Sequence, residues 1–409
     1  MDDERLNRQL LIEGWNQEAL DNAQIGIIGD DDSLASMYLM SSAALGINDF
    51  VVIAPSLDER LINVAKSVNP ELKIKFVKGN YTSQNLNCLL EDCDIITDVS
   101  HYGLANKLSL NLGYDKYKPV IRGLSDEEGF KVFTYERGRE WSELESIISQ
   151  PSFPNEHFDD PVLDMIASGI LLEETKNKLM NEKISNELIV YNREPLADID
   201  KSDNILVIGA GALGNFVGLG LGYSGFENIT FMDPDVAEIT NLNRQILLYD
   251  GVDKSKSATL AKRLKEFFGI NAKSREQYFN SSSRIHNYDV IFDCVDNFET
   301  RIVLSEKCKA KNKILISGGT NVDAGQSVLY NPDVDDKTPA ELLGLYDILG
   351  QRKLENYTRE RASCVYRPDP SVIMTNQVIG GFMVDAYKRH LSGQTIENIF
   401  YDSKSDTRT

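Results

Sequence analysis

The segment from Ile205 to Pro234 reads ILVIGAGALGNFVGLGLGYSGFENITFMDP, and this segment decides the fold. It predicts an apolar strand, a glycine turn, a long apolar helix and a second strand that ends at a proline. Continuous apolar runs such as ILVIG and NITFM are typical of parallel strands that are buried on both faces. Strands that alternate with helices in this way indicate an α/β fold, in which helices cover both faces of a mainly parallel sheet.

The same pattern occurs earlier in the chain. The segment from Ile25 to Pro55, IGIIGDDDSLASMYLMSSAALGINDFVVIAP, again runs through strand, glycine turn, helix and strand. Two further pairs of segments match in the same order: DCDIITDVSHYGLANKLSLN from Asp92 with NYDVIFDCVDNFETRIVLSE from Asn287, and PVIRGL from Pro119 with ILISGG from Ile314. Because the order is kept, we expect one Rossmann-like domain that is used twice.

We place the two copies at residues 1–145 and 186–409. The segment between them, residues 146–185, begins with the Pro-rich acidic stretch PSFPNEHFDDP and continues with helical periodicity. The first part therefore predicts a loop. The second part predicts either a linker helix or part of a substrate clamp, and of the two we favour the linker.

Composition limits the function. The chain has 409 residues, and its 63 acidic against 43 basic side chains give a net charge of −20. Such an acidic excess argues against nucleic-acid binding as the main function and against binding to anionic membranes. No apolar run reaches the roughly 18 residues of a membrane span. The charged start MDDERLNRQ is unlike a signal peptide.

The five cysteines are odd in number and form no CxxC pair. We therefore expect neither a disulfide framework nor a structural zinc site, and a reducing, cytoplasmic location fits best.

The glycine turn predicts a nucleotide site. Gly209, Gly211 and Gly214 form GAGALG between a predicted strand and a predicted helix. The first glycine permits the tight turn, the second lets backbone N–H groups approach phosphate, and the third lets helix and strand pack closely. Asp233 ends the next strand, where an acid typically binds a ribose hydroxyl. Alone, this pattern most often belongs to an NAD-dependent enzyme.

Residues after the glycine turn favour a triphosphate instead. A polar donor, Asn241, and two cations, Arg244 and Lys254, follow within a short stretch. NAD carries only a diphosphate, whereas ATP chemistry requires charge neutralisation on the β- and γ-phosphates and on leaving pyrophosphate. Further on, Asp293 and Asp296 follow an apolar strand in DCVDN. Carboxylates at the end of a strand are well placed to hold Mg²⁺ near those phosphates.

The segments RLNRQLLIEGWNQEAL, GAGALG, NLNRQ, DKSKSA and DCVDN together resemble the ThiF/MoeB/HesA family, relatives of the ubiquitin-activating enzymes. The resemblance covers nearly the whole chain, strongly in the second copy and weakly in the first. It implies ATP- and Mg²⁺-dependent adenylation of a carboxylate, usually on a small protein or peptide. It also implies that Asp233 binds ribose, that Asn241, Arg244 and Lys254 hold phosphates, and that Asp296 serves the metal and the reacting centre.

The first copy departs from this pattern at each point. Its glycine turn continues with three carboxylates, Asp30–Asp32, which would repel phosphate. Ala54 stands where the second copy has Asp233, and His101 stands where it has Asp296. We therefore expect the first copy to be unable to bind ATP.

The first copy nevertheless keeps Arg8 in RLNRQ. In dimeric family members this arginine reaches the partner's ATP, so the resemblance implies that Arg8 reaches the second copy's site within one chain. Its counterpart, Arg193, would then point toward the degenerate site. The chain thus resembles a fused pair of inactive and active halves, a pseudo-dimer, and a further homodimer stays open.

The fate of the adenylate divides the family. Some members pass the acyl group to a cysteine, and the candidate here is Cys364, with Arg361 and Arg367 nearby. A structural cysteine is the alternative. Family members with transfer chemistry also carry CxxC zinc pairs and additional domains that we do not find in the sequence.

Another branch matures ribosomally made peptides, as the microcin- and pantocin-type enzymes do. We therefore favour ATP-dependent carboxylate adenylation on such a peptide. Activation of a ubiquitin-like protein with a thioester on Cys364 is the first alternative, and an NAD-binding or non-catalytic module is the second.

Overall fold

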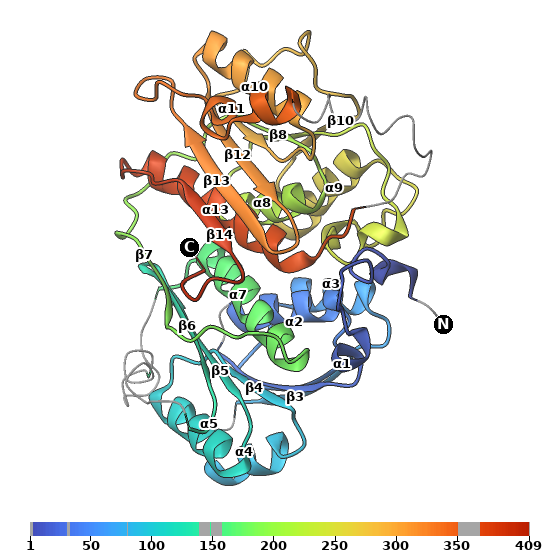
Figure 1. The fold of residues 1–409 in the computed structure, drawn as a ribbon, viewed down its shortest axis with the longest axis vertical. Coiled ribbons are helices and arrows are strands. Elements are labelled where there is room, and N and C mark those ends of the chain that lie inside the picture. Colours follow the sequence, from blue (N-terminus) through green and yellow to red (C-terminus); the bar gives the residue numbers. More distant parts are fainter. Residues whose placement is uncertain are drawn as a thin grey trace.

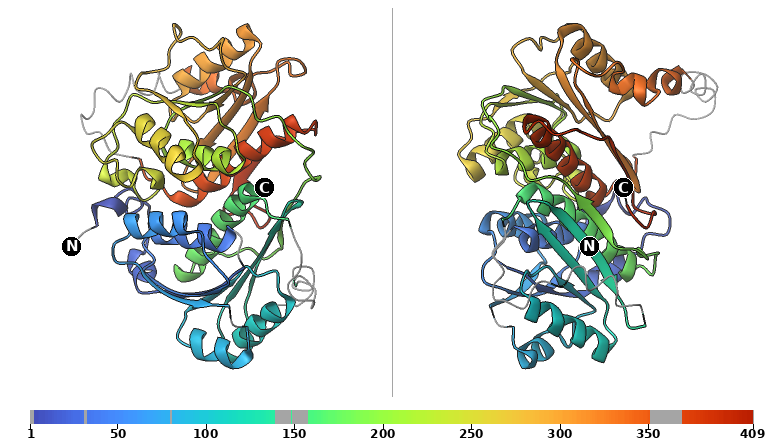
Figure 2. Two further views of the ribbon diagram at one scale, coloured as in Figure 1. Left: turned by 180° about the vertical axis from the view of Figure 1, so that it is seen from behind. Right: turned by 90° about the vertical axis from the view of Figure 1, so that its left-hand side faces the viewer.

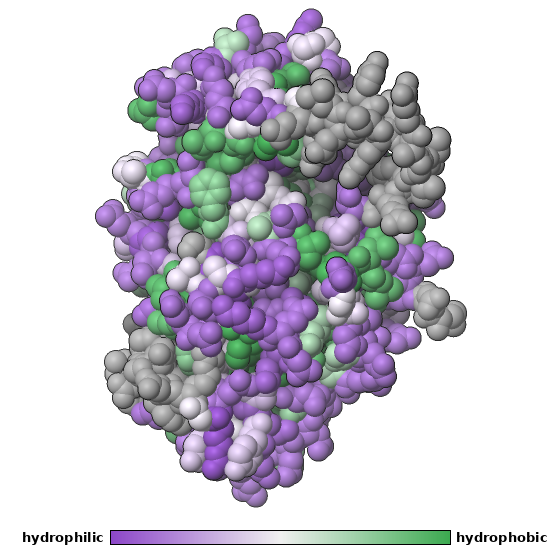
Figure 3. Space-filling model, viewed as in Figure 1, coloured by the Kyte–Doolittle hydropathy of each residue, from purple (hydrophilic) through white to green (hydrophobic). Residues whose placement is uncertain are grey.

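Two seven-stranded sheets lie on either side of a layer of helices (Figures 1 and 2). The computed structural model describes residues 3–30, 33–79, 81–138, 148, 158–350 and 369–408. Hydrophilic residues cover most of the face seen in Figure 3, as expected for a strongly acidic chain. Within the described residues, no helix combines the length and apolar character needed to cross a membrane.

The two sheets have the same topology. The first has the order β3-β2-β1-β4-β5-β6-β7 and the second the order β10-β9-β8-β11-β12-β13-β14. In each sheet the first five strands of this order are parallel to one another. The sixth strand is antiparallel to the fifth, and the seventh is antiparallel to the sixth. The strands are β1 (Gln24–Ile28), β2 (Asp49–Ala54), β3 (Lys73–Lys78), β4 (Ile95–Asp98), β5 (Val120–Asp126), β6 (Gly129–Tyr135), β7 (Ile189–Asn192), β8 (Ile205–Ile208), β9 (Ile229–Met232), β10 (Lys273–Arg275), β11 (Val290–Asp293), β12 (Ile314–Thr320), β13 (Ala324–Tyr330) and β14 (Ile399–Asp402). The predicted tandem Rossmann-like α/β fold is confirmed.

Strand register aligns the copies residue by residue. Ile28 pairs with Ile53 in the first sheet, and Ile208 pairs with Met232 in the second. Ala54, the residue after Ile53, therefore corresponds to Asp233, the residue after Met232.

Helices of both copies lie between the two sheets, and other helices cover the outer faces of the sheets (Figure 1). The described helices are η1 (Glu4–Leu6), α1 (Gln17–Asp21), α2 (Leu34–Leu45), α3 (Glu59–Val68), α4 (Ser83–Leu90), α5 (Gly103–Lys116), α7 (Pro161–Leu179), α8 (Ala212–Tyr223), η2 (Ile239–Asn241), η3 (Ile246–Leu248), α9 (Lys256–Phe268), α10 (Phe298–Lys311), α11 (Pro339–Leu342) and α13 (Ile373–Leu391). The views of Figure 2 agree that α7 and α13 lie side by side, and α2 packs on α7 as α8 packs on α13.

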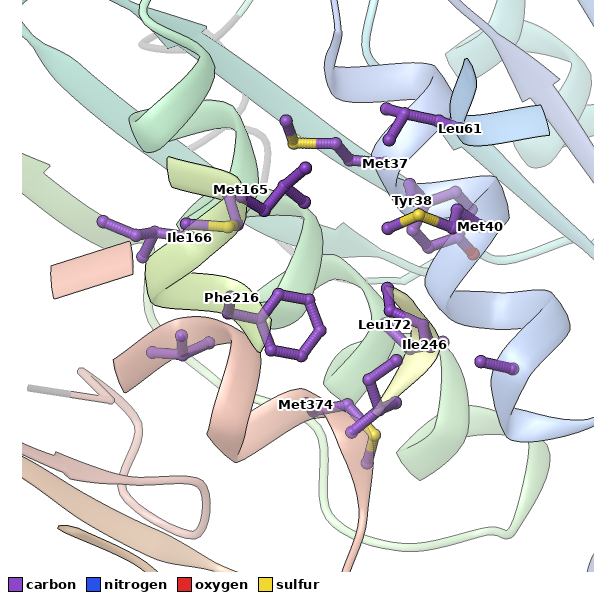
Figure 4. Close-up of a cluster of buried hydrophobic side chains, with 14 of the residues drawn as sticks. Met37, Tyr38, Met40, Leu61, Met165, Ile166, Leu172, Phe216, Ile246 and Met374 are labelled. Carbon is purple, nitrogen blue, oxygen red and sulfur yellow. The ribbon is translucent and has the colours of Figure 1, made fainter. Parts of the chain in front are cut away.

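One apolar core joins the halves. A single cluster of buried side chains contains residues from both sheets and from all four of these helices. Figure 4 shows Met37 and Met165 of the first half in one cluster with Phe216 and Met374 of the second. The halves therefore share this central core, and each half has a further buried cluster of its own.

The helix of residues 146–185 has a different role from the linker or clamp that we expected. Helix α7 is almost entirely buried, and it connects β6 to β7 just as α13 connects β13 to β14. Both helices have 19 residues. The segment Ile189–Asn192, which the sequence analysis assigned to the second copy, is the last strand of the first sheet. Sequence periodicity did not reveal this role because α7 is buried on every side.

Candidate active site

The glycine turn lies between β8 and α8. Gly209 has a φ of 95°, and a Cβ there would lie 2.5 Å from the carbonyl oxygen of Cys294. A Cβ on Gly214 would lie 2.0 Å from the carbonyl oxygen of Gly209, so neither position accepts a side chain. Gly211 is the N-cap of α8, and the nearest atom to a Cβ there is 3.8 Å away. The start of α8 is thus open to an approaching anion.

Asp233 follows β9 and borders this turn. Its Oδ2 accepts a 2.7 Å hydrogen bond from the N–H of Ala210, and its Oδ1 accepts one of 2.8 Å from the N–H of Asp235. Burial raises the pKa of Asp233 despite these two donors. The carboxylate is therefore fixed in orientation at the edge of the glycine turn.

A pocket of about 580 Å³ begins at the residue after Asp233. The backbone N–H of Asp233 donates to the carbonyl of Arg275 at 3.1 Å, which joins the pocket wall to Asp233. The pocket is lined by Pro234, Arg275, Glu276, Gln277, Tyr278, Asn280, Ser282, Ser283 and Arg284. Its volume is in the range of small-molecule sites.

Arg244 is a buried cation, and the charged groups that act on it are Arg8 and Glu238. Its Nη1 donates to the carbonyl of Thr240 at 3.0 Å and to Oδ1 of Asn243 at 2.8 Å. Among the described residues, no carboxylate forms an ion pair with Arg244, and its Nε and Nη2 make no hydrogen bond. Burial and the nearby charge of Arg8 lower the pKa of Arg244 to about 10. A buried guanidinium left in this state is suited to an anionic ligand.

Arg8 of the N-terminal segment contacts the second half of the chain. The N-terminal segment lies against η2 (Figure 1), where Arg8 Nη1 donates to the carbonyl of Asp369 at 3.4 Å. The carbonyl of Arg8 accepts a 3.3 Å bond from the N–H of Ser371. The structure thus brings Arg8 close enough to Arg244 to lower its pKa. Two neighbouring arginines make a site that favours a polyanion.

Asn241 and Lys254 have more indirect positions. The Oδ1 of Asn241 accepts a 3.0 Å bond from the N–H of Glu238 and so shapes the η2 turn. The exposed Lys254 donates to the carbonyl of Asp250 at 2.9 Å. The structure does not bring Lys254 into contact with the other predicted phosphate ligands.

The two aspartates of DCVDN have different surroundings. Asp293 is buried, accepts a 2.7 Å hydrogen bond from the Ser317 hydroxyl, and has a pKa that burial raises above its usual range. The expectation that Asp293 could hold a metal therefore does not fit its internal position. Asp296 is exposed and forms no ion pair with the described residues, and it follows two residues after Cys294, whose carbonyl oxygen approaches Gly209. Asp296 remains available to a ligand.

Gln245 is a site residue that our sequence analysis did not single out. Its side chain is 5% exposed, and its Oε1 has no hydrogen-bond partner within the described part of the chain. Its Nε2 is the atom nearest to a Cβ on Gly211. An unpaired buried amide next to the start of α8 indicates a ligand-facing group. The signal was the position of Gln245 at the end of NLNRQ, directly after Arg244.

A family model described as the ThiF family matches residues 184–405. The chain belongs to the ThiF family. It is 36% identical over 136 residues to "Adenylyltransferase and sulfurtransferase MOCS3" of Drosophila sechellia, covering 32% of this chain and 30% of that protein. It is 35% identical over 139 residues to "Probable molybdopterin-synthase adenylyltransferase" of Porphyra purpurea, covering 32% of this chain and 36% of that protein. The chain thus spans about a third of these curated relatives.

Solved structures of E. coli MccB also match the chain. MccB with AMPCPP and MccA has a TM-score of 0.41 at 19% identity, covering 50% of this chain and 65% of that one. MccB with ATP has a TM-score of 0.40 at 20% identity, covering 49% of this chain and 61% of that one.

The corresponding region of the first ThiF-like copy is closed by its own side chains. Asp30 Oδ2 accepts hydrogen bonds from the backbone N–H of His101 at 2.5 Å and lies 3.2 Å from Nδ1 of the same residue. Ser100 donates to the other carboxylate oxygen at 3.2 Å. Burial acts to raise the pKa of Asp30, but the hydrogen bonds to His101 have the larger combined effect, so the pKa is lowered. A carboxylate therefore occupies the turn. Residues 31 and 32 lie outside the described residues.

Arg193 does not point into the degenerate site, contrary to our expectation. Its guanidinium donates to Asp160 and to Asp385 of α13, and Lys388 reaches the same Asp160 at 2.5 Å. Asp160 and Asp385 form ion pairs with the buried Arg193 guanidinium and compensate its charge. Arg193 therefore links the halves.

The candidate nucleophile Cys364 and its neighbours Arg361 and Arg367 lie outside the described residues. Of the described cysteines, Cys93 and Cys308 are buried, and burial raises the pKa of each thiol to about 12. Neither thiol is poised as a nucleophile.

Proposed function

We propose that the protein uses ATP to adenylate a carboxylate on a peptide or small-protein substrate. The observation that carries the proposal is Arg244, a buried guanidinium that forms no ion pair with the described residues, whose pKa the charge of Arg8 lowers, and which directly precedes the Gln245 side chain near Gly211. An NAD site has no need of this pair, because a diphosphate carries less charge than ATP. The names of the curated relatives, which include adenylyltransferases, support the same chemistry.

In this reaction a substrate carboxylate oxygen attacks the α-phosphorus of ATP. A new O–P bond forms, the bond between the α-phosphorus and the β-bridging oxygen breaks, and pyrophosphate leaves with that electron pair. No general base is needed, because the carboxylate is already ionised at neutral pH. The protein therefore contributes position and charge rather than proton transfer.

The residues of the second half divide the binding of ATP. Asp233 holds the ribose, and the adjoining pocket that starts at Pro234 receives the base. The backbone N–H groups around Gly211 face the phosphates at the start of α8. Arg244 and Arg8 stabilise the negative charge that moves onto pyrophosphate. The family resemblance also assigns phosphate binding to Lys254 and Asn241, which would have to turn toward the nucleotide from their present bonds to Asp250 and Glu238.

The residues also fit one magnesium ion. Asp296 is an exposed carboxylate two residues after Cys294, whose carbonyl approaches Gly209, and Mg²⁺ in nucleotide sites commonly takes one or two carboxylates together with substrate phosphates. Bound there, the ion would neutralise phosphate charge.

Pyrophosphate exchange tests the proposal. Purified protein is given ATP, Mg²⁺, labelled pyrophosphate and a panel of peptides, each with a free carboxylate or as the matched amide. We expect label to enter ATP only with a carboxylate. Failure of every carboxylate peptide to support exchange, in protein shown to bind ATP, would contradict the proposal.

We propose maturation of a ribosomally made peptide as the biological setting, as the sequence analysis favoured. The second candidate is transfer through a thioester on Cys364, and the sulfurtransferase named among the relatives gives it weight. Replacement of Cys364 by serine separates the two. Full product formation by Cys364→Ser would exclude the thioester route, whereas adenylate formation without product would support it.

A further inference from the structure

Two buried amides connect the halves beside Arg244. Asn243 Nδ2 donates to Gln9 Oε1 at 3.0 Å, and both side chains are 0% exposed. Asn243 Oδ1 accepts the 2.8 Å bond from Arg244 Nη1. Gln9 Nε2 donates to the carbonyl of Leu45 at 2.8 Å. A continuous line of hydrogen bonds therefore runs from Arg244 in the second half to the end of α2 in the first.

The chemistry of the groups fixes the direction of this line. A guanidinium can only donate, and the carbonyl of Leu45 can only accept. Asn243 must therefore turn its oxygen to Arg244, and Gln9 must turn its nitrogen to Leu45. Successive bonds of one direction strengthen one another, and neither amide can reverse without losing bonds on both sides.

This arrangement determines which atoms of Arg244 are left for a ligand. Nη1 is occupied by Asn243 and Thr240, which leaves Nε and Nη2 without a hydrogen bond among the described residues. Gln9 also directly follows Arg8 in the chain, so the bond that orients Arg244 anchors the segment that carries the second arginine. Asn243 Nδ2 further donates to the carbonyl of Ser371 at 3.3 Å, at the segment that receives Arg8.

We propose that Asn243 and Gln9 are positioning residues for ATP, and that through them the degenerate first copy holds the arginines of the second copy's site. The inference rests on the proposed function. It gives the first copy a task in the reaction although its own nucleotide region is closed.

Binding of Mg²⁺-ATP to the full-length protein tests this without a known carboxylate substrate. Isothermal titration calorimetry compares the wild type, Asn243→Ala, Arg244→Ala and the double variant. We expect each single variant to raise Kd about tenfold, the factor of a lost hydrogen bond to a charged group. Because Asn243 acts through Arg244, the double variant should bind no more weakly than Arg244→Ala alone. If the fold increases in Kd of the two single variants multiply in the double variant, the inference is overturned.

Further variants keep the test independent of folding. Gln9→Met removes the two hydrogen bonds that Gln9 makes to Asn243 and Leu45 and leaves Asn243 and Arg244 unchanged. It should raise the Kd for ATP when Arg244 is present, but not in the Arg244→Ala background. Asn69→Ala is the matched control, since Asn69 is a buried amide of the first half bonded to Ala43. It should lower the thermal midpoint and leave Kd unchanged. An equal rise of Kd in Asn69→Ala would make the effect structural and overturn the inference.

The exchanged pair Gln9→Asn with Asn243→Gln keeps the combined side-chain length and should bind ATP better than either exchange alone. A wild type that does not bind ATP would contradict the proposed function and this inference together. A wild type that binds ATP with multiplying losses would contradict this inference alone.

Discussion

Gly381 of α13 lies against Ile166 of α7 so closely that a Cβ on the glycine would be 2.3 Å from Cγ1 of the isoleucine. At the equivalent place on α7, Gly169 faces Val378 of α13, and a Cβ there would be 2.8 Å away. The two helices thus cross at a pair of glycines related by the internal repeat. Because this crossing lies within the shared core, it determines whether the halves can dock.

The first prediction concerns this crossing. Gly381→Ala should lower the free energy of unfolding by about 1–3 kcal/mol, because overpacking outweighs the better helix propensity of alanine. Thermal or urea unfolding measures the loss. Gly350→Ala is the control, since no atom lies within 4 Å of a Cβ there. An unchanged or higher stability for Gly381→Ala would show that the helices can move apart freely.

The second prediction concerns pH and a carboxyl of α7. Asp164 is buried, and burial raises its pKa to about 7 although the hydrogen bond from Ser33 acts to lower the pKa. Asn376 occupies the equivalent position on α13. Between pH 4 and pH 7 the folded protein keeps a proton that the unfolded chain has lost, so this group makes stability fall as pH rises. Asp164→Asn should remove that fall and stabilise the protein more at pH 8 than at pH 5.

Urea unfolding at the two pH values checks this, with the exposed Asp198 changed to asparagine as the control. A stabilisation by Asp164→Asn that is equal at both pH values would refute the assignment.

The third prediction concerns the two arginines of the site. Arg244→Ala should cost on the order of 2–4 kcal/mol of transition-state stabilisation in pyrophosphate exchange, because the guanidinium meets charge that develops on the leaving group. Arg8→Ala should lower the same rate and leave the thermal midpoint unchanged. Arg137→Ala, an exposed arginine of the first half, is the control. A harmless Arg8→Ala would end the case for an arginine supplied by the first copy.

The features that could be predicted from the sequence are those that depend on the spacing of residues along the chain. The glycine turn, Asp233 and the matching order of both copies could be read directly, because turn geometry and apolar runs need particular residues at particular spacing. The approach of Arg8 to the second half followed from the family resemblance.

Features that depend on partners far away in the sequence could not be predicted. Helix α7 carries Glu174, a charge that suggests solvent, yet Arg408 from the end of the chain pairs with it in the core. Arg193 likewise finds Asp385 almost 200 residues away. Buried ionic pairs of this kind become visible only when both partners are placed.

The central claim is that one chain holds one ATP site, in the second copy. Calorimetric stoichiometry of Mg²⁺-ATP binding tests it most directly, with the wild type and Asp233→Ala side by side. We predict one ATP per chain in the wild type and loss of that binding in Asp233→Ala. Two ATP molecules per chain, or binding that survives Asp233→Ala unchanged, would contradict it.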